Sequence, residues 1–205
     1  MNPPQRDAKE ASVSSLPQPT NVKKASVSSQ QWQRSVRENL ILIVIALCLA
    51  LFIRTFVAEP RFIPSDSMLP TLHTGDRLVV EKISYLIHPP QLGDIVVFQP
   101  PTELQRRGYH KDQAFIKRVI GKPKDVVSIA NGKVYLNGQP LQEDYIAEPP
   151  ELPMRSRVVP NDEFFVLGDN RNDSNDSRYW GFLPRKNIIG RAVFRFWPLE
   201  RIGLI

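Results

Sequence analysis

An apolar run near the N-terminus limits which architectures this chain can adopt. Residues 40–53 are all apolar, Arg54 and Thr55 interrupt the run, and residues 56–58 extend it. As a helix, residues 40–58 would be roughly 28 Å long at about 1.5 Å per residue, close to the ~30 Å hydrocarbon core of a bilayer. Arg54 would lie near one end, where its side chain can reach the membrane interface. The run predicts a transmembrane signal-anchor helix over residues 38–58.

Two other interpretations of this run are a cleaved signal peptide and a buried core helix. Fourteen apolar residues fit the h-region of a signal peptide, but Phe56 occupies the position where cleavage after Ala58 would require a small residue. Residues 1–39 carry six Lys or Arg and three Asp or Glu. The positive-inside rule then places the N-terminus in the cytoplasm and everything after Ala58 on the trans side of the membrane.

The charge of the chain and the distribution of its basic residues indicate which kinds of molecule it can bind. The 27 Lys and Arg and 21 Asp and Glu residues give a net charge of +6. Basic residues form no stripe interleaved with aromatic ones, so we expect membrane lipid rather than nucleic acid as a partner. Residues 1–37 are rich in Ser, Pro and Gln and are expected to form a disordered cytoplasmic segment. Cys48 is the only cysteine, which excludes an intrachain disulfide and a cysteine-based metal site.

From residue 59 onward the pattern is that of short strands, which defines an extracytoplasmic domain over residues 59–205. Asn131-Gly132 and Asn137-Gly138 are two-residue hairpin signals and predict a small meander over residues 125–147, followed by an extended loop over residues 147–162. The expected strands are residues 77–82, 94–98, 114–120, 125–129, 133–136, 163–167 and 191–197.

Two short stretches carry candidate catalytic side chains. Ser65 and Ser67 lie between Pro64 and Pro70, in what reads as a rigid loop that could aim one hydroxyl.

Lys117 lies within an apolar strand, where lysine is rare unless it is paired or functional. Alternation along the strand places Lys117 on one face with Phe115 and Val119, and Arg118 on the other, exposed face. A serine hydroxyl needs a base, and burial can lower a lysine pKa enough for lysine to be that base. Separately, a polar turn and an edge-strand lysine would explain the two stretches equally well.

A third polar segment spans residues 168–181 and contains Asp169, Asp173 and Asp176. Its short side chains are typical of loops held rigid by side-chain bonds to backbone, and its Asp spacing does not match a calcium-binding EF-hand loop. A Ser-His-Asp triad would require one of the three histidines. His73, His88 and His110 all lie in polar or Pro-rich stretches, so we expect them at the surface.

Taken together, these segments resemble the type I signal peptidases, membrane-anchored serine proteases of protein export. The resemblance covers residues 36–200. Residues 65–71 resemble the nucleophile motif, residues 93–98 the following strand, residues 115–125 the general-base motif, and residues 168–184 the last motif. Lys124 departs from the pattern, since the family often has glycine there. The resemblance implies a mostly antiparallel β fold in two parts, with a small β-hairpin insertion at about residues 125–160.

The resemblance also implies a role for each matching residue. Ser67 would be the nucleophile and Lys117 the general base, with the Ser67 N–H and the Ser65 hydroxyl as the oxyanion hole. Ser174 would orient the lysine. The supporting ion-pair network would contain Asp169, Asp176, Arg178 and Arg118, with Arg118 as the partner of Asp169. The membrane-associating residues would be Met68, Leu69 and Phe62.

We therefore expect an endopeptidase that removes signal peptides from preproteins after small residues at the −1 and −3 positions. It would need no metal or cofactor and would act as a monomer. One alternative is a Ser-Lys self-cleaving regulator, but residues 1–39 are too polar for the helix-turn-helix that it would require. The other is a non-catalytic anchored β module, in which Ser67 and Lys117 would be coincidental.

Overall fold

The structure is a computed structural model that describes residues 29–205. The chain divides into two compact units, Met1–Ile45 and Ala46–Ile205, and each is described by itself. Residues 1–37 were expected to be disordered. Residues 1–28 of this segment lie outside the described residues. For residues 29–37 the expectation was wrong, because they form the first turns of a helix.

The N-terminal helix α1 spans Ser29–Phe52 and continues as a π-helical turn, η1, over Ile53–Val57. The stretch Trp32–Val57 has 26 residues and is long and apolar enough to cross a membrane. Its apolar side chains are exposed. A water-soluble core helix would bury such side chains, whereas here none of them contributes to a protein core.

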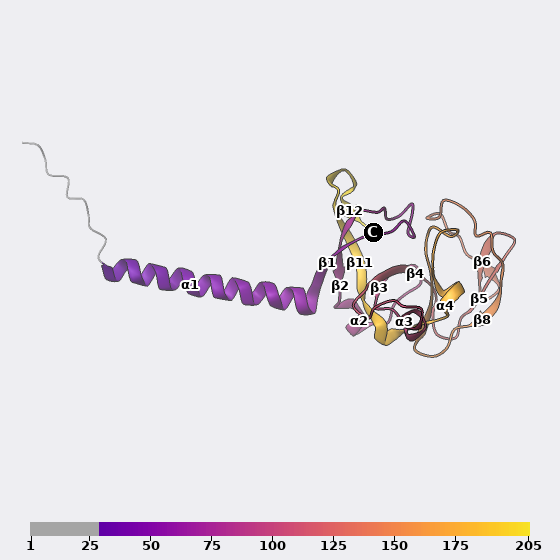
Figure 1. Ribbon diagram of the computed structural model, residues 1–205, viewed down its shortest axis with the longest axis horizontal. Coiled ribbons are helices and arrows are strands. Elements are labelled where there is room, and N and C mark those ends of the chain that lie inside the picture. The colour runs from indigo at the N-terminus through magenta and orange to yellow at the C-terminus, as the bar shows by residue number, and fades with distance from the viewer. Residues whose placement is uncertain (1–28) are drawn as a thin grey trace, which may run out of the picture. The chain divides into compact units, whose positions relative to one another are not determined.

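The main sheet has eight strands in the order β1-β2-β11-β3-β4-β9-β10, with β12 paired to β11, and all the paired strands are antiparallel. Six of these strands lie side by side in Figure 1 from β1 and β12 to β4. Their bounds are Ala58–Phe62 (β1), Arg77–Glu81 (β2), Ile95–Phe98 (β3), Phe115–Gly121 (β4), Glu163–Leu167 (β9), Leu183–Pro184 (β10), Ile188–Trp197 (β11) and Gly203–Leu204 (β12).

The centre of the main sheet is buried on both faces. All four residues of β3 are buried, and alternate residues belong to different clusters: Ile95 and Val97 pack with one, Val96 and Phe98 with the other. The short helices α2 (Ser84–Ile87), α3 (Thr102–Arg106) and α4 (Ser177–Trp180) and the 3₁₀ turns Arg185–Asn187 and Leu199–Arg201 connect the strands. A strand with two covered faces can hold a side chain away from water.

A second, four-stranded sheet has the order β7-β6-β5-β8. Its strands are Val126–Ala130 (β5), Lys133–Leu136 (β6), Gln139–Pro140 (β7) and Met154–Val158 (β8). In Figure 1, β5, β6 and β8 lie beyond β4, on the side away from β1 and β2. Both predicted hairpin turns are present, since Asn131, Gly132, Asn137 and Gly138 all have positive φ, as a tight type I′ turn requires.

The seven predicted strands are confirmed within one to three residues at their ends, and so is the mostly antiparallel β fold. The extended loop predicted over residues 147–162 was wrong in part, because β8 lies within it and pairs with β5. The residues of β8 show only a weak alternation of polar and apolar side chains. The strand forms because it pairs with β5, which is distant in sequence. Lys124 has a φ of 74°, a region that glycine adopts more readily than lysine.

Candidate active site

Strand β4 places Lys117 in the interior of the main sheet. Lys117 pairs with Val96 of β3, and Phe115 and Val119 pack in the cluster that contains Val96, as strand alternation predicts. The Lys117 residue is only 3% exposed. Its Nζ donates a 2.9 Å hydrogen bond to the carbonyl oxygen of Ile116, which fixes the end of an otherwise flexible side chain.

The loop after β1 presents Ser67 to this lysine. Met68 and Leu72 are fully buried on either side of the loop's turn, and the N–H of Leu72 donates to the carbonyl of Met68 at 2.9 Å. Ser67 Oγ lies 2.7 Å from Lys117 Nζ and 3.3 Å from Ser65 Oγ. The nucleophile and base expected from the sequence therefore lie within hydrogen-bonding distance, as a nucleophile activated by a base requires.

Burial lowers the pKa of Lys117 from its ordinary value of 10.5 to about 8. Desolvation is the main cause, because a charged ammonium loses its hydration inside the protein. The negative charges of Asp176 and Asp169 oppose this change, and the positive charge of Arg178 adds to it. A substantial fraction of Lys117 is consequently neutral near pH 8 and able to accept a proton.

This pKa predicts how activity depends on pH. Deprotonated Lys117 becomes more abundant as pH rises, so kcat/KM should rise about tenfold per pH unit below pH ~8 and level off above it. Cleavage of a preprotein measured from pH 6 to 10 tests this expectation. A profile that is flat through this range would show that Lys117 does not titrate in the free enzyme as the reacting base.

The loop that follows β9 completes the site, because β9 pairs with β4 through Arg118↔Leu167 and Val119↔Val166. Residues 168–177 therefore leave the sheet beside the base. Asn170 binds the nucleophile loop: its N–H donates to the carbonyl of Ser67 at 3.2 Å and its side-chain amide to the carbonyl of Asp66 at 3.1 Å. Asn170 was missed from the sequence, where it looked like one of several interchangeable loop residues.

Two buried ion pairs flank the dyad. Arg118 donates to Asp169 at 2.8 and 2.6 Å, and Thr71 of the nucleophile loop donates to the same carboxylate at 2.6 Å. Arg178 donates to Asp176 at 2.8 Å through two nitrogens. The pairing of Arg118 with Asp169 that the resemblance implies is present. The expectation from strand alternation that Arg118 would be exposed was wrong, because its side chain is only 11% exposed.

Ser174 does not contact Lys117 in the way expected. Its Oγ is buried and has no hydrogen-bond partner among the described residues. The carbonyl of Ile116 is instead the second partner of the lysine. Ser174 lies beside Gly168, close to the nucleophile loop rather than hydrogen-bonded to the base.

Gly168 is a second residue that sequence reasoning missed. A Cβ at this position would lie 2.2 Å from Ser174 Oγ and 2.4 Å from the backbone oxygen of Ser67. Because the second contact is with backbone, the Ser67 loop would have to move.

Gly168→Ala should therefore lower kcat/KM by about 10²-fold or more, since a displacement of about 1 Å can cost that much. Gly203→Ala, where a Cβ would meet nothing within 4 Å, is the control in the same cleavage assay, and equal activity of the two variants would contradict the expectation.

A third buried ion pair joins the loop between β7 and β8 of the second sheet to the loop that follows β9. Arg171 donates to Glu143 through two nitrogens at 2.7 Å each, and its Nε donates to the carbonyl of Gly168 at 3.1 Å. Tyr145 donates to Glu143 at 2.8 Å and lies under the guanidinium of Arg118 at 4.0 Å. Arg171 and Glu143 are distant in sequence, and nothing in either segment indicated that they would meet.

Glu143→Gln should destabilise the protein, because it leaves the buried Arg171 charge without its counter-ion. Removing one partner of a buried pair typically costs ~3–5 kcal/mol. Thermal unfolding of the variant measures the effect, and Glu151→Gln, at an exposed residue, is the matched control. A Tm equal to that of the control would mean that the pair does not hold this loop in place.

The predicted membrane-associating residues do not form one exposed group. Met68 is fully buried and packs with Ile63, Leu72 and Leu78, so its assignment was wrong. Hydrophobicity alone does not distinguish a surface contact from a core residue. Phe62 is 59% exposed, and Leu69 is half-buried. The three histidines are exposed as expected.

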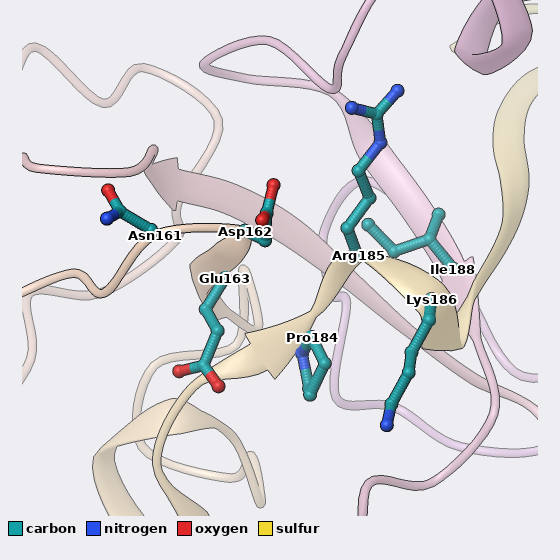
Figure 2. A pocket seen from close by; sticks show the side chains of 7 residues that line it. All are labelled: Asn161, Asp162, Glu163, Pro184, Arg185, Lys186 and Ile188. Atoms are coloured by element: carbon teal, nitrogen blue, oxygen red, sulfur yellow. The ribbon is translucent and has the colours of Figure 1, made fainter.

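The dyad opens into a cleft of about 360 Å³ that is lined by residues 64, 65, 67, 109 and 113–117. A larger cavity of about 530 Å³ lies elsewhere and shares none of these residues. Figure 2 shows Glu163 and Lys186 on the two sides of Pro184 in that cavity, with Arg185 pointing away from them. Its lining contains no serine, threonine or cysteine, so it does not combine a hydroxyl or thiol with a base as the smaller cleft does.

A β scaffold that pairs a serine hydroxyl with a buried lysine has the features of a serine peptidase with a lysine base. The profile of the family described as signal peptidase, peptidase S26, matches residues 36–197. The chain therefore belongs to this family of serine peptidases, which remove signal peptides from preproteins. Neither the self-cleaving regulator nor the non-catalytic module is favoured.

Two relatives found by sequence agree with this assignment. The chain is 62% identical over 172 residues to a probable signal peptidase I-1 of Synechocystis, covering 84% of this chain and 87% of that protein. It is 56% identical to a signal peptidase I of Leptolyngbya laminosa, covering 81% and 82%. A crystal structure of a signal peptidase I from Enterococcus faecalis V583 is 34% identical, with a TM-score of 0.42, and covers 50% of this chain and 95% of that one.

Proposed function

We propose that this signal peptidase cleaves preproteins with Ser67 as nucleophile and Lys117 as general base. The observation that carries the proposal is the 2.7 Å separation of Ser67 Oγ and a buried Lys117 Nζ. Neutral Lys117 takes the proton of Ser67 as Oγ attacks the scissile carbonyl carbon. The ammonium so formed then donates this proton to the leaving amine, and the signal peptide stays on Ser67 as an ester.

Two donors support the oxyanion that forms in each step. The N–H of Ser67 has no acceptor among the described residues, and the Ser65 hydroxyl lies 3.3 Å from Ser67 Oγ. Oxyanion donors are typically worth about 10²–10³ in rate. Water attacks the ester while Lys117 accepts its proton, and Lys117 returns a proton to Ser67 Oγ as the signal peptide leaves.

The buried ion pairs position these groups without touching the substrate. Asp169 joins Arg118 on the base strand to Thr71 on the nucleophile loop. Asp176 accepts from the N–H of Gly168 at 3.1 Å and is neutralised by Arg178.

The apolar helix determines the proposed topology of the chain in the membrane. Residues 38–58 cross the membrane with the N-terminus in the cytoplasm, and residues 59–205 form the catalytic domain on the trans side. The exposed Phe62 and the partly exposed Leu69 lie in the segment that follows the helix and would contact lipid. The enzyme acts as a monomer and cleaves after small residues at −1 and −3, which fit a shallow cleft.

Cleavage of a purified preprotein by the detergent-solubilised full chain tests the proposal. The wild-type protein should release a mature protein whose N-terminus follows a small-x-small site, as mass spectrometry would show. An alanine-to-leucine change at −1 of the substrate should abolish release. Unchanged cleavage of that altered preprotein, or cleavage at many other sites, would contradict the proposed specificity.

A further inference from the structure

An arginine-rich hollow lies between β8 and α4, away from the dyad. Its volume is about 300 Å³, and its charged lining consists of Arg155, Arg157 and Arg178. No carboxylate lines it. Arg178 is neutralised by Asp176, whereas neither Arg155 nor Arg157 has an ion-pair partner within residues 29–205. The hollow therefore carries uncompensated positive charge.

Strand geometry explains why these two charges act together. Arg155 and Arg157 are two residues apart on β8, so their side chains lie on the same side of the strand. Arg157 donates a long, 3.4 Å hydrogen bond to the carbonyl of Ser177. β8 is the outer strand of the second sheet, and both arginines are exposed. Their guanidinium groups remain available to a partner.

One shared residue and one hydrogen bond link this hollow to the dyad cleft. Tyr179 lines both the hollow and a second depression of about 440 Å³, which Ser174 and Asn175 also line. The Asn175 amide donates to Tyr109 Oη at 3.3 Å, and Tyr109 lines the dyad cleft. Asp173 and Arg107 also line the middle depression. We refer to the route through the cleft, the depression and the hollow as the arginine track.

We propose that the arginine track binds acidic side chains in the early mature region of the preprotein, and so selects among substrates. The inference rests on the proposed function. A signal peptide has a basic n-region and an apolar h-region, so carboxylates near the cleavage site belong to the mature part. Guanidinium groups bind carboxylates in a planar, two-bond geometry. In this proposal, the mature part of a preprotein held at Ser67 runs along the track in an extended conformation.

The test compares two preproteins that differ only in the mature part. One carries glutamates within about ten residues of the cleavage site, a span of ~33 Å when extended, and the other carries glutamines. The wild-type full chain should show kcat/KM about 3- to 10-fold higher for the glutamate form, as expected for a few partly exposed ion pairs. The ratio should fall towards one as salt screens the charges.

Two variants assign the preference to the track. Arg155→Gln with Arg157→Gln should bring the ratio to about one. Arg155→Glu with Arg157→Glu should reverse the ratio, so that the glutamine form is cleaved faster than the glutamate form. A reversed ratio would also show that the variant is folded, because a misfolded enzyme would cleave neither preprotein. Arg185→Gln with Lys186→Gln removes the same charge at the cavity of Figure 2 and should leave the ratio unchanged.

The remaining outcomes overturn the inference. A wild-type ratio of one, or an equal loss in the Arg185 and Lys186 control, would show that the track does not read acidic residues. Loss of binding to phosphatidylglycerol vesicles by the glutamine variant, with an unchanged substrate ratio, would assign the arginines to lipid. Failure of the wild type to cleave either preprotein would instead contradict the proposed function.

Discussion

Lys117→Met is expected to lower kcat/KM for preprotein cleavage by about 10³–10⁴-fold or more, while leaving the protein folded. General-base catalysis typically contributes about 10²–10⁴ in rate, and a nucleophile and base that act as a unit lose nearly everything when one is removed. Lys117→Arg should be equally inactive, because arginine stays protonated at any working pH. Rates of cleavage under single-turnover conditions measure the loss directly.

The same substitution should increase stability, which separates loss of the base from loss of structure. The pKa of Lys117 is about 8 in the folded protein, against an ordinary 10.5. The unfolded chain binds more protons between these values, so the wild-type free energy of unfolding rises with pH across that window. At pH 7 the cost of the buried charge is at most about 3 kcal/mol, and Lys117→Met removes it.

Thermal unfolding of both proteins at pH 7 and above pH 10.5 checks this account. The variant should have the higher Tm at pH 7, and the difference should shrink at high pH. Lys133→Met, at an exposed position, is the control for loss of a lysine. An inactive variant with a strongly reduced Tm would instead assign Lys117 a structural role.

Ser67→Ala should abolish turnover, with a loss of about 10⁴-fold or more, because no other hydroxyl of residues 29–205 lies within hydrogen-bonding distance of the base. Ser65 Oγ is close to Ser67 Oγ, but no contact joins it to Lys117 within the described residues. Ser67→Cys should keep part of the activity, since a thiol can also be deprotonated by a neutral amine.

Trapping of the intermediate distinguishes the two serines. The wild-type protein should form a covalent ester with the signal peptide at Ser67, which peptide mapping can locate, and Ser67→Ala should form none. Ser65→Ala should still form the ester, more slowly, because it removes only an oxyanion donor. Ser128→Ala, on the second sheet, controls for loss of a hydroxyl. Normal turnover by Ser67→Ala would end the nucleophile assignment.

The sequence was most informative where the residue type itself restricts the environment. Lysine within an apolar strand is costly to bury, so Lys117 could be identified without any structure. Asn-Gly pairs favour the positive φ of tight hairpins, and both turns occur where predicted. An uninterrupted apolar run of helix length predicted the N-terminal helix, whose side chains are exposed.

Errors occurred where burial depends on distant parts of the chain. Met68 follows the nucleophile and reads as equally suited to lipid or to core, and contacts with Ile63, Leu72 and Leu78 decide for the core. Arg118 was expected to be exposed because strand alternation places it on the face opposite Lys117. The buried Asp169, 51 residues later, holds it in place.

The sequence by itself determined the apolar helix and the antiparallel β character, because each depends on local periodicity. It also made Ser67 and Lys117 candidates, which the resemblance to type I signal peptidases then joined as a pair. Only the tertiary structure decided the 2.7 Å approach of Ser67 to Lys117, the close passage of Gly168 past Ser67 and the pairing of Arg171 with Glu143. Those contacts join segments that are far apart in sequence, and the sheet register that brings them together arises from packing over the whole core.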